Sequence, residues 1–154
     1  MRDCVEPEGF DVALDVYTTF GYFDDPADDR RVLENAFASL RPDGVLLMEL
    51  MGLECLAVRG FKPLIVKRQE DGSLFINEPR AVDDWSAVET TWTLVRGETV
   101  QTYQFRIRLH GAGDLPVMLR DVGFNRVDLF GSLDGTPYDH TARRLVIVAR
   151  KGGT

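Results

Sequence analysis

A strand, a helix and a second strand follow one another near the start of the chain, and this order limits the possible folds more than any other feature. Residues 10–17 have the apolar composition of a buried strand. Apolar residues at helical spacing then predict a helix over about residues 28–40, which Pro42 ends. A turn at 41–44 leads into a second buried strand at 45–49. Two strands joined through a helix lie parallel in one sheet, so the sequence predicts an α/β fold.

The first predicted strand lacks a neighbour in the sequence. Parallel sheets are normally covered on both faces and continue on both sides. Only nine residues precede the strand at 10–17, which is too few for another strand beside it. We therefore expect a domain of residues 1–154 that lacks its N-terminal half. Because proteins usually pair or cover such an edge, we also expect a homo-oligomer, or a partner chain, that contacts the strand at 10–17.

The middle of the chain has a different pattern. Asp71-Gly72 and Arg96-Gly97-Glu98 each separate two segments that are rich in β-branched and aromatic residues, which is typical of hairpins. We expect an antiparallel β insertion at residues 61–110. After it, Asp114 and Gly123 are predicted to bound a short helix, and residues 126–130 and 144–149 are the last predicted strands.

The overall composition excludes several classes of function. The 154 residues are 44% hydrophobic and 28% charged, as in an ordinary globular protein, and the net charge is −7. This negative charge argues against nucleic acid and against an anionic membrane surface as partners. No apolar run is long enough to cross a membrane. Cys4 and Cys55 have neither metal-ligand spacing nor the number expected of a disulfide framework, so we expect a cytoplasmic protein without a metal site.

Four stretches resemble one known family. The segments FDVALDVYTTFGYF and RRVLENAFASLRPDGVLLMEL are similar to the central part of class I S-adenosylmethionine-dependent methyltransferases of small molecules. DLPVMLRDVGF and LFGSLDGTPYDHTARRLVIVARK resemble the late helix, closing loop and last strand of that family. The resemblance implies a partial Rossmann-like methyltransferase sheet, S-adenosylmethionine as cofactor and a small-molecule acceptor. The family's glycine-rich motif and acidic ribose-binding residue lie upstream of the matched stretches, so the chain corresponds to the substrate-side portion.

The ends of the two parallel strands are the predicted binding site, because ligands of open α/β sheets bind beyond the carboxyl ends of the strands. Aromatic rings there suit a sulfonium or an aromatic substrate, although the same rings could simply pack beneath the helix. Glu49 ends a buried strand and either contacts the acceptor or reaches solvent. We assign the cofactor to Asp15, Tyr17, Thr18, Phe20 and Tyr22, and the acceptor to Gly21 and Glu49.

The predicted catalytic residues are His110, Tyr138 and Asp139. Methyl transfer depends mainly on alignment, and a general base is needed only where the acceptor loses a proton. His110 precedes a Gly-Ala-Gly segment that suits a cavity rim, but a lone histidine is more often structural. Tyr138 and Asp139 lie in a loop that resembles the acceptor loop of the family and is also typical of a plain turn. Arg143 and Arg144 are predicted to form surface ion pairs of small effect.

Two hypotheses of function follow. In the first, the chain is the C-terminal portion of a methyltransferase that acts on a small molecule. In the alternative, it is a non-catalytic, methyltransferase-like module for binding or dimerisation.

Overall fold

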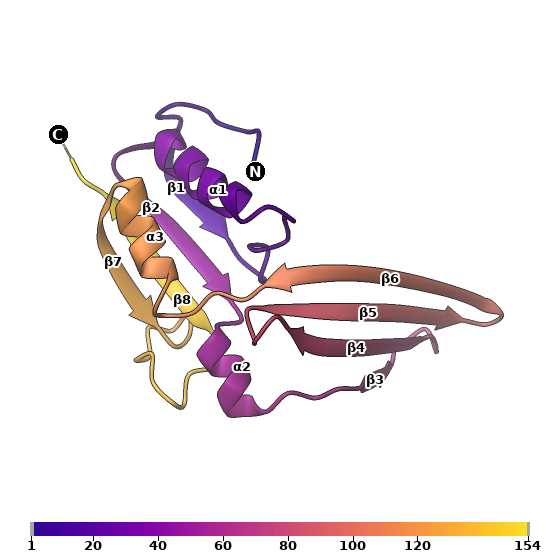
Figure 1. Ribbon diagram of the computed structural model, residues 1–154. Coiled ribbons are helices and arrows are strands. Elements are labelled where there is room, and N and C mark those ends of the chain that lie inside the picture. Colours follow the sequence, from indigo (N-terminus) through magenta and orange to yellow (C-terminus); the bar gives the residue numbers. More distant parts are fainter. Residues whose placement is uncertain (1, 154) are drawn as a thin grey trace. The chain divides into compact units, whose positions relative to one another are not determined.

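The computed structural model describes residues 2–153, which form two compact units. We call residues 2–59 and 110–153 the core unit, and Gly60–Leu109 the hairpin unit. The chain leaves the core unit after α2 (Leu53–Arg59) and returns to it before α3 (Leu115–Val122), as Figure 1 shows. Each unit has its own sheet.

The sheet of the core unit contains the predicted strand–helix–strand segment. Its order is β1-β2-β8-β7, with β1 at Phe10–Asp15, β2 at Leu40–Leu50, β7 at Phe124–Phe130 and β8 at Leu145–Lys151. Helix α1, Pro26–Ser39, joins β1 to β2, which are parallel. β8 is antiparallel to both β2 and β7. The predicted fold class, an α/β methyltransferase-like sheet with an antiparallel insertion, is confirmed.

Helix α1 begins and ends for local reasons. The carboxylate of Asp25 accepts a hydrogen bond from the Ala27 N–H at 2.8 Å, and Pro26 occupies the first turn. The helix ends at Ser39, because Leu40 is already extended and begins β2. The predicted turn at 41–44 is instead an irregular start of β2, where Asp43 has a φ of 61° and the pairing with β1 shifts register.

Helices α1 and α3 pack against one face of this sheet (Figure 1). The core between them is made of aliphatic side chains from β2, β8 and the two helices, together with Phe20 and Phe124: Val32, Leu33, Leu46, Met48, Leu50, Leu115, Leu119, Leu145, Ile147 and Ala149. Gly123 ends α3 with a φ of 126°, where a side chain would strike the ring of Phe37. The helical spacing predicted this inward face correctly.

β1 differs from its sequence-based prediction. It ends at Asp15, two residues earlier than expected, and Val12 and Leu14 are 53% and 66% exposed. Its outer edge has no strand beside it within residues 2–153. The prediction of a buried strand is therefore wrong for these side chains, because no second neighbour and no covering layer reaches them in the described chain.

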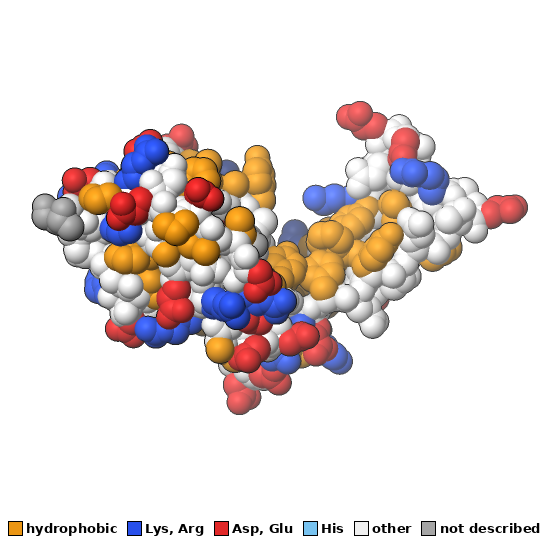
Figure 2. Space-filling model, turned by 90° about the horizontal axis from the view of Figure 1, so that it is seen from above, with side chains coloured by type: hydrophobic (Ala, Val, Ile, Leu, Met, Phe, Trp, Pro, Cys, Tyr) orange, Lys and Arg blue, Asp and Glu red, His pale blue; other side chains and the backbone are white. Residues whose placement is uncertain are grey.

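The hairpin unit is a twisted antiparallel sheet. Its strands follow the order β3-β4-β5-β6, and their bounds are Ile65–Arg68, Leu74–Val82, Ala87–Arg96 and Thr99–Arg108. Trp92 lies edge-on to Phe75 and to Phe105, with ring centroids 5.4 and 4.7 Å apart. Hydrophobic side chains gather over this sheet in the right half of Figure 2. Alternation along the strands thus produces one aromatic face.

Among the described residues, no helix is long and apolar enough to cross a membrane. Within the same residues, no group of three or more His, Cys, Asp and Glu side chains is placed to hold a metal ion.

Candidate functional site

The carboxyl ends of the parallel strands β1 and β2 lie at the same end of the core sheet. The loop that follows β1 there has an unusual backbone. Tyr17 and Thr18 have φ values of 62° and 56°, a left-handed conformation that non-glycine residues rarely adopt. Two such residues in succession present the Tyr17 side chain to solvent at 87% exposure. Strained conformations of this kind concentrate at functional sites, so this edge is the first candidate site.

Glu49 holds this loop in place. Its carboxylate is buried and accepts a hydrogen bond from the Tyr17 N–H at 2.8 Å, while its backbone carbonyl accepts from the Thr18 N–H at 3.1 Å. The Arg144 guanidinium pairs with the second carboxylate oxygen at 2.8 Å. The expectation that Arg144 forms a surface pair is wrong, because its partner is a buried carboxylate. Glu49 thereby positions Tyr17, and contact with the acceptor remains a prediction.

The other residues predicted around this loop are less exposed. Asp15 is 4% exposed, and its Oδ1 accepts a hydrogen bond from the Thr19 hydroxyl at 2.7 Å. Its Oδ2 has no hydrogen-bond partner in residues 2–153, and burial raises the pKa of the carboxyl. Phe20 is buried in the core. Gly21 follows it with a φ of 93°, and Tyr22 is partly exposed.

His110 is buried between two carboxylates. Its Nδ1 lies 2.7 Å from Asp114 Oδ2, its Nε2 lies 3.2 Å from Asp29 Oδ2, and its ring packs against Phe20. Burial disfavours the imidazolium, but the bonds to Asp114 and Asp29 outweigh it and raise the pKa of His110. His110 therefore ties α1 to the start of α3, and its predicted catalytic role stays a prediction.

The Asp114 carboxylate bonds to His110 and does not cap α3. It occupies the N-cap position of α3, but its side chain makes no capping bond there. Its carboxylate accepts from the Gly111 N–H at 2.7 Å and contacts His110. Asp114 thus bounds α3 as predicted, but its side chain does not cap the helix, because the buried histidine and the preceding loop take both carboxylate oxygens.

Tyr138 and Asp139 line a separate cavity of about 240 Å³ in the core unit, together with Glu54, Cys55 and His140. The Tyr138 hydroxyl donates to Glu54 Oε2 at 2.9 Å and accepts from the Cys55 thiol at 3.7 Å. Burial and these two neighbours raise the pKa of Tyr138, which keeps the hydroxyl protonated. Tyr138 is therefore a fixed hydrogen-bonding group.

Asp139 remains ionised for a local reason. Its Oδ1 accepts from both the N–H and the hydroxyl of Thr141, at 2.8 and 2.7 Å, and these bonds lower the pKa of Asp139. A carboxyl with a lowered pKa is a weak base and a good partner for a cation.

Sequence reasoning missed Glu54, although two glycines marked its surroundings. A side chain at Gly111 would come within 2.7 Å of the Glu54 carboxylate, and one at Gly52 would come within 2.7 Å of the Tyr138 hydroxyl. Gly52 lies two residues after β2, so this cavity adjoins the carboxyl end of that strand. The signal available in the sequence was a glycine close after a buried strand.

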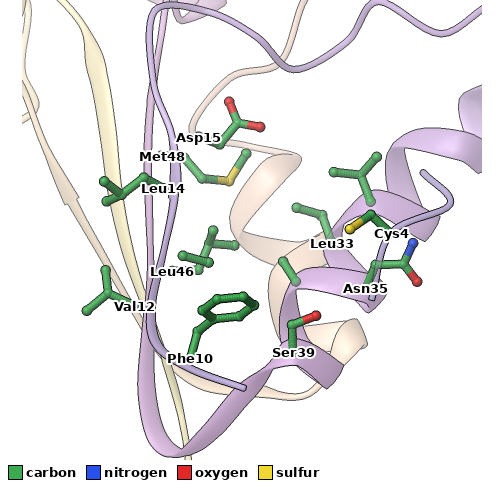
Figure 3. Close-up of a pocket in the computed structure, with 13 residues that line it drawn as sticks. Cys4, Phe10, Val12, Leu14, Asp15, Leu33, Asn35, Ser39, Leu46 and Met48 are labelled. Carbon is green, nitrogen blue, oxygen red and sulfur yellow. The ribbon is translucent and has the colours of Figure 1, made fainter. Parts of the chain in front are cut away.

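A groove of about 390 Å³ lies between β1, α1 and β2 (Figure 3). Its walls are mainly apolar and include Leu33, Leu46 and Met48. Asp15 lies at one end of the groove, and Ser39 and Phe10 lie at the other. The groove follows β1, whose outer edge has no strand beside it within residues 2–153.

Solved structures share this fold. The S-adenosylmethionine-dependent methyltransferase of Clostridium acetobutylicum matches with a TM-score of 0.83 and 14% identity, over 99% of this chain and 62% of that protein. The CcbJ methyltransferase of Streptomyces caelestis matches at 0.77 and 14% identity, over 92% and 61%. A sugar N-methyltransferase of a Streptoalloteichus species matches at 0.68 and 16% identity, over 98% and 60%. No family model and no curated protein matches the sequence.

These matches establish the fold of class I S-adenosylmethionine-dependent methyltransferases for this chain, as the resemblance predicted. The chain spans 60% to 62% of the length of the three proteins.

Proposed function

We propose that this chain is the substrate-side portion of an S-adenosylmethionine-dependent methyltransferase that acts on a small molecule. The observation that carries the proposal is the carboxyl edge of β1 and β2 in a methyltransferase fold, where Glu49 holds two left-handed residues and presents Tyr17 to solvent. Ligands of open α/β sheets bind at this edge.

The cofactor is assigned to the loop after β1. When bound, S-adenosylmethionine supplies a methyl group that is already activated by its sulfonium. The exposed ring of Tyr17 fits a sulfonium, since a cation over an aromatic face gains about 0.5–2 kcal/mol. Thr18 holds the loop through its hydroxyl, which accepts from the Met51 N–H at 3.1 Å. The remaining residues assigned to the cofactor are Asp15, Phe20 and Tyr22, which flank this loop in the sequence.

The acceptor is assigned to the cavity beside Gly52. The Tyr138 hydroxyl and the Glu54 carboxylate are fixed by mutual hydrogen bonding, and Asp139 adds a second negative charge. These groups suit the binding and orientation of a polar or cationic acceptor. Rate enhancement would then come chiefly from alignment of the acceptor. His110 is retained as the proposed base where the acceptor must lose a proton.

Calorimetric titration of the chain with S-adenosylmethionine and S-adenosylhomocysteine tests the cofactor site. We expect micromolar binding of both. Because only S-adenosylmethionine carries a sulfonium, Tyr17→Ala should weaken it by roughly 2- to 30-fold and weaken S-adenosylhomocysteine less. Tyr103→Ala, at an exposed tyrosine of the hairpin unit, is the matched control. A folded chain that binds neither compound would refute the proposal for this chain alone.

The second candidate function is a non-catalytic methyltransferase-like module for binding or dimerisation. The open apolar edge at β1 favours it, because a chain with such an edge gains stability by covering it.

A further inference from the structure

The cavity that Tyr138 and Asp139 line presents mainly hydrogen-bond acceptors to a ligand. Its other polar side chains are those of Glu54, Cys55 and His140. The Tyr138 hydroxyl donates its proton to Glu54 Oε2 at 2.9 Å, and the Cys55 thiol donates to the Tyr138 oxygen at 3.7 Å. Of these five side chains, the His140 imidazole alone can still act as a donor. A ligand that fits this cavity must therefore bring donors of its own.

Both carboxylates of the cavity keep acceptor capacity for such a ligand. Glu54 accepts one hydrogen bond at each oxygen, from the Ala112 N–H at 2.8 Å and from Tyr138, and each oxygen has a second lone pair. Asp139 accepts both of its bonds from Thr141 at Oδ1, so its Oδ2 has no hydrogen bond to residues 2–153. Those bonds lower the pKa of Asp139 and keep it negatively charged. Within the described residues, no Lys or Arg lines the cavity to balance this charge.

The class of ligand follows from this charge and from the need for donors. The carboxylates repel a carboxylate or phosphate group on the ligand. A ketone or an ether has no proton to donate, and an alcohol has a single one. An ammonium group is positively charged and has several N–H donors, and its hydrogen bonds to carboxylates are about twice as strong as those between neutral groups. Of these groups, an amine matches the cavity best.

The size and the apolar lining of the cavity limit how much of the ligand it holds. Its volume of about 240 Å³ lies below the range of roughly 300–1,000 Å³ that is usual for pockets of drug-sized ligands. Val58 and Ala142 complete its lining with apolar side chains. The cavity therefore suits the amine-bearing end of a small molecule, with the carbons next to the nitrogen against the apolar side chains.

We propose that the methyl acceptor is an amine, and that Glu54 and Asp139 select it by holding its nitrogen in this cavity. The role of acceptor rests on the proposed function, whereas the binding of an amine rests only on the groups that line the cavity. The cavity adjoins the carboxyl end of β2, where Glu49 positions the loop assigned to the cofactor. An amine held there lies at the end of the sheet where a methyl group would be available.

Methyl transfer to nitrogen explains why negative charge is useful at this position. The reactive form is the neutral amine, so an ammonium first releases one proton to solvent, which reaches the exposed Glu54 and Asp139. The nitrogen lone pair then forms the new N–C bond, while the C–S bond of the sulfonium breaks and its electron pair remains on sulfur. Positive charge thus moves from sulfur to nitrogen. The two carboxylates stabilise the nitrogen more strongly as this charge develops, which lowers the barrier.

Three probes with the same six-membered ring test this selection: cyclohexylamine, cyclohexanol and cyclohexanecarboxylate. NMR titration of the chain follows the amide of Ala112, whose N–H binds Glu54. At neutral pH the amine is protonated, since alkyl amines titrate near the lysine value of about 10.4. We expect cyclohexylamine to bind roughly 10-fold more tightly than cyclohexanol, because its hydrogen bonds to the carboxylates are charge-assisted. Cyclohexanecarboxylate should bind more weakly than either.

Two variants locate the binding of the amine. Glu54→Gln and Asp139→Asn each remove one negative charge and keep an oxygen acceptor. Each should weaken the binding of cyclohexylamine by roughly 10-fold and change that of cyclohexanol little. Asp134→Asn removes the same charge from an exposed position of the same loop, outside the cavity lining, and should change neither. Because Asp139 is exposed, Asp139→Asn still gives a decisive result if Glu54→Gln does not fold.

A second titration tests whether the amine lies beside the transferred methyl group. If it does, the sulfonium of bound S-adenosylmethionine repels the ammonium, whereas S-adenosylhomocysteine carries no such charge. At neutral pH, where the protonated amine is unreactive, cyclohexylamine should therefore bind more weakly to the chain saturated with S-adenosylmethionine than to the chain saturated with S-adenosylhomocysteine. Cyclohexanol should bind equally to both.

Equal affinity for cyclohexylamine and cyclohexanol would overturn the inference, and so would amine binding that neither Glu54→Gln nor Asp139→Asn weakens. Equal affinity of the amine with the two cofactor forms would separate it from the transferred methyl group and also overturn the inference. Binding of S-adenosylhomocysteine without any preference for the amine would reject the amine acceptor and leave the proposed function standing. Selective amine binding by a folded chain that binds neither cofactor form would support the amine site and contradict the proposed function.

Discussion

β1 and β8 belong to the same sheet and are both mainly apolar, with the sequences FDVALD and LVIVARK. Their environments differ completely. β8 lies between β2 and β7, and Leu145, Ile147 and Ala149 are fully buried. Within residues 2–153, β1 pairs with β2 alone, and Val12 and Leu14 are mostly exposed. Strand composition thus shows that a segment is suited to burial, whereas its neighbours decide whether it is buried.

Within residues 2–153, this contrast separates a covered side of the core sheet from an exposed one. The β8 side has two strand neighbours and helices packed on the sheet. The β1 side has an apolar groove, an unpaired edge and a buried carboxylate oxygen without a donor from the described residues. Substitutions on the two sides should therefore affect stability differently.

The largest difference is expected between Ile147→Ala in β8 and Val12→Ala in β1. Removal of the fully buried Ile147 side chain should lower the free energy of unfolding by about 2–5 kcal/mol. The exposed Val12 should contribute less than about 0.5 kcal/mol. Urea denaturation measures both values. Equal losses would mean that β1 is already covered in solution.

The pair between Glu49 and Arg144 joins the ends of β2 and β8, and its loss should have the next largest effect. Arg144→Ala leaves the buried Glu49 carboxylate without its charged partner. We expect a loss of about 1–3 kcal/mol in the free energy of unfolding, because one side of the pair remains open to solvent. Arg143→Ala is the matched control and should change stability by less than about 0.5 kcal/mol. Equal effects of the two arginines would contradict the pair's structural role.

Asp15→Asn should stabilise the free chain by about 1 kcal/mol at neutral pH. Burial raises the pKa of Asp15 in the folded state, so the stability it contributes is present below its unfolded pKa and lost as pH rises through the folded pKa. Asparagine removes this loss and still accepts the hydrogen bond from Thr19. Thermal unfolding measures the change, with the exposed Asp134→Asn as control. A destabilised Asp15→Asn chain would indicate that Oδ2 already has a donor in solution.

The smallest effect is expected from His110, because burial and its two carboxylate contacts act in opposite directions. Its pKa is raised above the unfolded value, so its stabilisation is complete below the unfolded pKa and declines as pH rises through the folded pKa. Urea denaturation between about pH 6 and 9 should show this decline. His110→Gln should remove the decline, while His140→Gln, in an exposed loop, should preserve it. An unchanged slope in His110→Gln would assign the titration to another group.

Sequence reasoning found the βαβ segment and both hairpins because their signals are local. Helical spacing before Pro42 and the Asp71-Gly72 turn each depend on residues close together in the chain. It did not find the partners of the site residues. His110 meets Asp29 across 81 positions, and Tyr138 meets Glu54 across 84. Nothing in one sequence relates residues at such separations.

The amino-acid pattern was enough to establish an α/β fold with an antiparallel insertion, since strand and helix periods follow from neighbouring residues. The tertiary structure alone decided that Glu49 binds Arg144 and the Tyr17 backbone, that His110 lies between two carboxylates, and that the Val12 and Leu14 side chains of β1 are exposed. These outcomes depend on which distant segments pack together, and packing is set by the whole fold.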